Sequence, residues 1–177
     1  MTLEQYIQSL QNIKPSEKKL LQSGFTEVPL HIIKNYVLEK KGNADINHNF
    51  PDSLIFNLFN TYDTWYLRFA DFTFNREIVE RDGLFIFGDS SSSELCFKSF
   101  DSEVMEIDHD EHTVLEYCAK DTESFLKALL FIFELYALRF QNLADVGDDI
   151  VNQKCLNDCV EAAGGIRYKR FYRDIIG

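Results

Sequence analysis

The sequence lacks the short motifs by which many enzymes are identified. It contains no GxxxxGK[ST] or GxGxxG phosphate-binding loop, no HExxH metal motif and no GxSxG nucleophile motif. Only four cysteines occur, and no two of them form a CxxC pair. We therefore expect a protein that is not an enzyme and that needs neither a metal nor a cofactor.

Basic residues are also in short supply. The 177 residues include 18 Lys and Arg against 29 Asp and Glu, which gives a formal net charge of −11. Such a chain repels nucleic acid and anionic membranes, and it attracts basic partners. The charge therefore favours a basic protein partner over nucleic acid or a membrane.

No apolar run is long enough to cross a bilayer. The most apolar segment, FLKALLFIFELYALRF, is short and contains Lys127, Glu134 and Arg139. The N-terminal stretch MTLEQYIQSLQNIK has no basic region followed by an apolar one, as a secretory signal would. These features predict a cytoplasmic protein, in which the cysteines are reduced thiols packed in the core. The four are Cys96, Cys118, Cys155 and Cys159.

Apolar residues are abundant enough for a folded core, since they make up 45% of the chain and include sixteen phenylalanines. In the N-terminal part, apolar residues at helical spacing predict a helix at Leu3–Leu10 and a second one starting at Ser16. Further helices are predicted over Pro29–Lys41 and after Pro51, with a loop at residues 43–49 between them.

From Trp65 the pattern becomes that of strands. TWYLRFADFTF alternates, and the segments LFIF, ELCFKSF, EVMEID and HTVLEYCA follow, separated by turn residues such as those at 81–83 and 101–102. Asp121 then begins a long helix, and Asp148 begins another that ends at the glycine pair 164–165. Helices, consecutive strands and helices again predict one α+β domain, with a mainly antiparallel or mixed sheet of about four to six strands backed by helices.

Three local clusters contain residue types that can bind an ion or act as a nucleophile. The serine run in GDSSSSE is flanked by Asp89 and Glu94, which would repel an anion, so a solvated turn is favoured. In an extended strand Asp108 and Asp110 point to one face and His109 to the other, which argues against a shared metal. Cys96 and Cys118 lie in apolar strands, where thiols are inert, and nothing places a histidine beside a serine.

The segment from 101 to 111 contains six acids and no lysine or arginine. If Met105 and Ile107 pack inward on their strand, Glu106, Asp108 and Asp110 point outward. Two interpretations stay open: a surface that speeds the approach of a basic partner, or an ordinary solvated sheet face. As a docking surface it would consist of Asp101, Glu103, Glu106, Asp108, Asp110 and Glu111.

The C-terminal tail IRYKRFYRDIIG is basic, in contrast to the acidic chain as a whole. Basic residues interleaved with aromatic ones are typical of proteins that bind single-stranded nucleic acid. In a strongly acidic chain we instead expect the aromatic residues to pack on the body of the protein. The bases Arg167, Lys169, Arg170 and Arg173 are then expected to pair with acids there.

Several of these segments, in this order, resemble the SUKH superfamily, a set of bacterial immunity-type proteins that also includes a yeast cell-wall regulator. The resemblance rests on Phe50-Pro51 followed by FNLFN and Asn60, and on FIFGDSSSSELCF, DSEVMEIDHDE and DTESFLKALL. It covers about 46–135. The residues before it form a helical extension, 1–45, and those at 141–177 form a second.

The resemblance implies a single α+β domain that binds a cognate toxin domain, often a nuclease, and blocks it without catalysis. Toxins that act on nucleic acid tend to have basic clefts, which an acidic protein would complement. The relationship to the yeast protein implies an alternative, a regulatory or scaffold module with an endogenous partner.

Overall fold

The computed structural model describes residues 1–42, 53–99 and 101–177. Six strands form one sheet in the order β1-β2-β3-β4-β5-β6, and every neighbouring pair is antiparallel. The strands are β1 (Arg68–Phe69), β2 (Phe72–Arg81), β3 (Leu84–Asp89), β4 (Ser93–Phe97), β5 (Val104–Asp108) and β6 (Val114–Ala119). The α+β class and the helix-backed antiparallel sheet are therefore confirmed.

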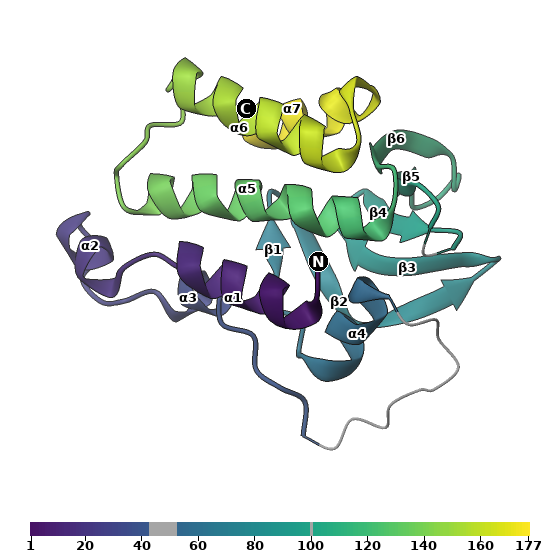
Figure 1. Ribbon diagram of the computed structural model, residues 1–177, viewed down its shortest axis with the longest axis horizontal. Helices are drawn as coiled ribbons and strands as arrows, with labels where there is room; N and C mark the ends of the chain where they lie inside the picture. The colour runs from purple at the N-terminus through teal and green to yellow at the C-terminus, as the bar shows by residue number, and fades with distance from the viewer. Residues whose placement is uncertain (43–52, 100) are drawn as a thin grey trace.

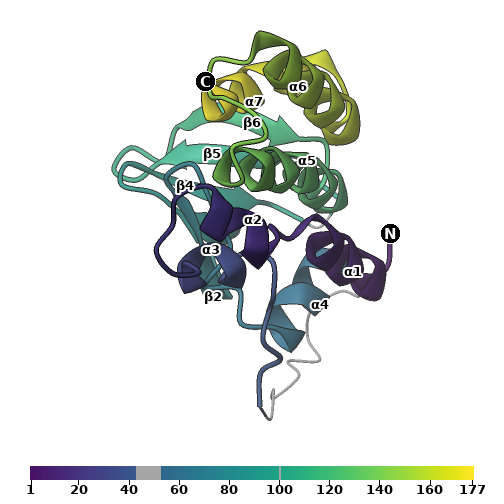
Figure 2. The ribbon, with the colours of Figure 1, turned by 90° about the vertical axis from the view of Figure 1, so that its left-hand side faces the viewer.

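Helices flank the sheet segment on both sides in sequence. Before it come α1 (Leu3–Ile13), α2 (Glu17–Gln22), α3 (Leu30–Lys34) and α4 (Leu54–Thr61); after it come α5 (Thr122–Phe140), α6 (Asp149–Ala163), the 3-10 helix η1 (Ile166–Tyr168) and α7 (Lys169–Ile176). In Figure 1, α5 lies between α6 and α1, and Figure 2 shows these three helices stacked along one side of the sheet.

Local signals account for the most regular elements. The carboxylate of Asp121 accepts a hydrogen bond from the Ser124 amide at 2.7 Å, which caps α5 as predicted. Between β2 and β3, Asp82 and Gly83 both have positive φ, 54° and 75°, as a tight right-twisted hairpin requires. Gly164 ends α6 in the left-handed region, at φ 112°.

Phenylalanines form the centre of the main core, between the sheet and the helices. Phe87 of β3 contacts Phe125 on α5 and also packs against Phe74 and Phe97 of the neighbouring strands, and all four are fully buried. Their rings meet edge-on or tilted, as in the pair Phe87–Phe125 with centroids 5.5 Å apart. Each buried phenylalanine contributes roughly 1.5–3 kcal/mol of hydrophobic stabilisation, so this layer fixes the position of α5 over the sheet.

The opposite face of the sheet carries a second, smaller core. It consists of Ile86, Cys96, Met105 and Ile107, and the side chains of Leu84 and Tyr117 pack against it. The strands β3 to β5 therefore bury apolar side chains on both faces, as the apolar run at Leu84–Phe87 predicted for β3.

The predicted helix over Pro29–Lys41 is wrong beyond Lys34. Residues 39–41 form backbone hydrogen bonds with the chain after α4: the amide of Lys41 donates to the Thr61 carbonyl at 2.9 Å, and that of Asp63 to the Glu39 carbonyl at 2.8 Å. This long-range pairing replaces the helical bonds that the local pattern suggested. The predicted loop at 43–49 and helix position of Pro51 lie outside the described residues.

The cysteines follow their prediction, and the tail follows it in part, because Arg173 pairs with Asp174 of the tail itself and Lys169 has no ion pair among the described residues. All four cysteines are buried free thiols. On the tail Tyr168, Phe171 and Tyr172 are buried, while Arg167 and Arg170 reach back to Glu103 before β5 and Glu116 on β6. In the part of the chain that the structure describes, no helix combines the length and the apolar character that crossing a bilayer requires.

Candidate docking surface

Alternate turns of the sheet lie at the same end, because each antiparallel strand reverses the chain. The β1–β2, β3–β4 and β5–β6 turns share one end, and this end carries Asp71, Asp110 and Glu111. Asp101 and Glu103 belong to the β4–β5 connection at the other end, roughly 17 Å away along β5. The structure therefore does not bring the six predicted acids into one surface.

Glu106 lies in the middle of β5 and faces the helices. Its direct cross-strand partners are Leu95 on β4 and Glu116 on β6, and partners in a ladder share a face of the sheet. Leu95 is fully buried in the main core, and Glu116 is bonded to Arg170 of α7 at 2.9 Å. The prediction that Glu106 points outward is therefore wrong, because Met105 and Ile107 occupy the opposite face.

One buried serine binds the Glu106 carboxylate, and a second buried serine contacts the first. The Ser93 hydroxyl donates to Glu106 Oε1 at 2.7 Å, and Ser90 Oγ lies 2.9 Å from Ser93 Oγ. Both serines are buried, whereas Ser91 and Ser92 are exposed. The predicted solvated turn is thus wrong for Ser90 and Ser93, because both are buried and Ser93 donates to Glu106.

Other carboxylates surround Glu106. Burial raises the pKa of Glu106 above its ordinary value, and the negative charges of Asp71, Glu116 and Asp174 raise it further, while the Ser93 hydrogen bond acts in the opposite direction. Among the described residues no Lys, Arg or His forms an ion pair with Glu106. This half-buried carboxylate therefore lacks a cation of its own.

Of the other predicted acids, some already accept hydrogen bonds within the protein and others are exposed to a partner. Asp108 accepts the amides of Asp110 and Glu111 at 2.8 Å each, and these bonds hold its pKa below the usual range. Asp110 and Glu111 are themselves exposed at the turn. Glu103 is already bound, since Arg167 Nε lies 3.1 Å and the Tyr168 hydroxyl 3.0 Å from its Oε1.

Seven acids around Glu106 and at the adjoining sheet end form the surface that we call the acidic end. They come from two turns, two neighbouring strands and α7: Asp71, Glu106, Asp108, Asp110, Glu111, Glu116 and Asp174. Sequence reasoning missed Asp71, Glu116 and Asp174. The alternation of β6 identifies Glu116 once the ladder is known, but Asp71 and Asp174 carry no local signal, because only the fold brings them to Glu106.

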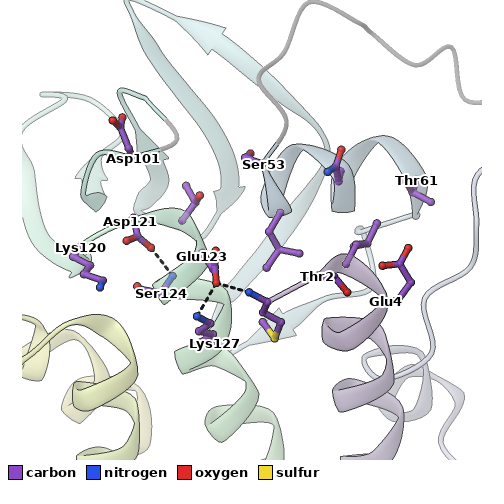
Figure 3. A pocket seen from close by; sticks show the side chains of 15 residues that line it. Thr2, Glu4, Ser53, Thr61, Asp101, Lys120, Asp121, Glu123, Ser124 and Lys127 are labelled. Atoms are coloured by element: carbon purple, nitrogen blue, oxygen red, sulfur yellow. Dashed lines mark hydrogen bonds and ion pairs between the residues drawn. The ribbon is translucent and has the colours of Figure 1, made fainter.

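A cleft of about 800 Å³ opens elsewhere, at the N-terminal end of α5 (Figure 3), and Asp101 lines its edge. The charge of Glu123 in this cleft is already compensated. The Glu123 carboxylate binds the Lys127 ammonium and the amino group of Met1, both at 2.7 Å, and these contacts lower the pKa of Glu123. The acidic end, with its unpaired Glu106, is therefore the stronger candidate for binding a cation.

The two thiols of the sheet, Cys96 on β4 and Cys118 on β6, are buried and poorly suited to act as nucleophiles. Burial raises the pKa of Cys96 to about 12 and that of Cys118 well above its ordinary value, so both stay protonated at neutral pH.

Comparisons of this chain with known proteins identify no relative. The chain matches no protein-family model, and neither a curated protein nor a solved structure is significantly similar to it.

Proposed function

We propose that this chain is a non-catalytic immunity-type protein that binds and neutralises a basic toxin domain through the acidic end. The resemblance of its ordered segments to the SUKH superfamily supports this function. The observation that carries the choice of surface is Glu106, a half-buried carboxylate beside three other acids and without a cationic partner among the described residues.

A lysine or arginine of the partner would neutralise the charge of Glu106. It would form a charge-assisted hydrogen bond with Glu106 and offset the repulsion from Asp71, Glu116 and Asp174. The exposed Asp110 and Glu111 at the neighbouring turn would raise the rate of encounter without needing exact contacts. Removing one partner of such a desolvated pair typically costs about 2–5 kcal/mol of binding.

The function is tested by co-expression. The reading frame beside this gene is expressed in a bacterial host alone, with this protein, and with the variant Glu106→Lys. We expect toxicity of the neighbour alone, rescue by the native protein with a complex recovered on purification, and reduced rescue by the variant. A neighbour whose toxicity the native protein cannot relieve would contradict the immunity function.

An apolar groove favours one second candidate, a scaffold module with an endogenous protein partner. The groove, of about 240 Å³, lies between α5 and α6 and is lined by Phe131, Leu135 and Val151. Ile150 at its edge is 84% exposed. If the partner recovered from cells loses binding to Ile150→Glu but not to Glu106→Lys, this function replaces the first.

A further inference from the structure

Two carboxylates and an imidazole meet on the face of the sheet opposite to Glu106. Asp89 at the end of β3 is the direct cross-strand partner of Glu94 on β4, and His109 reaches them from the β5–β6 turn. One ligand atom from each residue lies within 4.8 Å of the other two. His109 Nε2 and Asp89 Oδ1 are already 2.9 Å apart.

The backbone holds these three residues in place. The Ser90 amide donates to the Ser93 carbonyl at 2.9 Å, which closes the turn between β3 and β4. Ser93 is paired with Asp108, and the His109 amide donates to the Ser92 carbonyl at 3.3 Å. Asp89 and Glu94 thus stand on ladder positions and His109 in a turn tied to Ser92, so little backbone entropy would be lost when they bind an ion.

We propose that Asp89, Glu94 and His109 bind a divalent ion of the zinc class. An imidazole nitrogen with two carboxylates is a ligand set that zinc accepts, with three protein ligands and a water in the fourth position. Around tetrahedral zinc the ligand atoms stand about 3.3 Å apart, so the carboxylates need to turn inward by no more than about 1.5 Å.

The two facing carboxylates also favour a bound cation. Like charges directly opposite each other in a ladder are destabilising, and a cation between Asp89 and Glu94 removes that repulsion. Arg81 now fills part of this role through an ion pair with Glu94. Zinc must displace its guanidinium, so Arg81 weakens the site as a competitor.

The proposal goes beyond the docking function, because it concerns other residues on the other face of the sheet. It also differs from a local Asp108–His112 metal site, which the strand alternation argued against. Only His109 of that segment takes part, and its partners come from β3 and β4.

The test is isothermal titration of the full chain with Zn²⁺, alongside His109→Gln, His112→Gln and Arg81→Gln. His112 is an exposed histidine of the same turn outside the cluster, so its variant is the matched control. We expect one zinc per native chain, a loss of affinity of at least about tenfold for His109→Gln, and unchanged affinity for His112→Gln.

Arg81→Gln is expected to bind zinc several-fold more tightly, since it removes the competitor of the metal at Glu94. Circular dichroism of each variant confirms that the fold is kept. The proposal is overturned if the native chain binds no stoichiometric zinc, if His109→Gln and His112→Gln behave alike, or if Arg81→Gln leaves the affinity unchanged or lower.

Discussion

Replacing Glu106 by glutamine should make the protein more stable at neutral pH. The amide keeps an oxygen that accepts the Ser93 hydroxyl, while the negative charge beside Asp71, Glu116 and Asp174 disappears. A like-charge pair across a ladder costs a fraction of a kcal/mol to about 1 kcal/mol. Since Glu106 is only half-buried, solvent screens this repulsion, and we expect a gain of about 0.5–1 kcal/mol.

The pH dependence follows from the raised pKa. The folded protein holds the Glu106 proton more tightly than the unfolded chain does, so the penalty is absent below the ordinary value of 4.5 and grows as the pH rises through the folded-state pKa. The gain from Glu106→Gln should therefore be present at pH 7 and vanish at about pH 3.5.

The assay is urea and thermal unfolding followed by circular dichroism at both pH values. A gain of this size corresponds to a rise in Tm of roughly 1–4 °C. Glu161→Gln, at an exposed position on α6, is the matched control and should change little. A variant that is less stable than the native protein at pH 7, or equally affected at both pH values, would refute the reasoning.

Three further substitutions test the packing around the site, each by urea unfolding. Ser93→Ala removes the donor to Glu106 and should destabilise by about 1–3 kcal/mol; no loss would mean that this bond contributes nothing. Asp121→Ala removes the α5 cap and should cost about 0.5–2 kcal/mol, which Asp121→Asn should largely restore. Phe171→Ala, which empties the contact of α7 with the core, should cost about 3–5 kcal/mol, and a cost below 1 kcal/mol would show that α7 is loosely attached.

Local chemistry made much of the fold predictable. The cap at Asp121, the left-handed stop at Gly164 and the hairpin at Asp82-Gly83 each depend on residues adjacent in sequence. The burial of the aromatic residues of the tail was also predicted correctly, whereas Arg173 pairs with Asp174 of the tail and not with the body. The helix over Pro29–Lys41 failed at the point where long-range pairing with Thr61 and Asp63 competes with helical hydrogen bonds.

Which face of β5 turns toward the helices could not be predicted from the sequence, for a different reason. Both faces of that strand bury apolar residues, Val104 on the helix side and Met105 with Ile107 on the other. Alternation shows which residues share a face, but not which face the helices cover. The position of Glu106, and with it the grouping of Asp71 and Asp174 around it, depends on that second choice.

The central claim is that a basic partner docks on the acidic end. The most direct test measures the association rate of the partner recovered from co-expression, over a range of salt concentrations. The test variant is Glu106→Gln/Asp110→Asn/Glu111→Gln, which spares Asp108 because its carboxylate holds the turn. The control neutralises three exposed acids elsewhere, Glu17, Glu77 and Glu161, and so changes the net charge equally.

We expect association of the test variant to be at least about tenfold slower at low salt, with the difference shrinking as salt is added, and the control to stay close to the native rate. Equal rates for the two triple variants would contradict the account, because the partner would then respond to net charge alone and not to the acidic end.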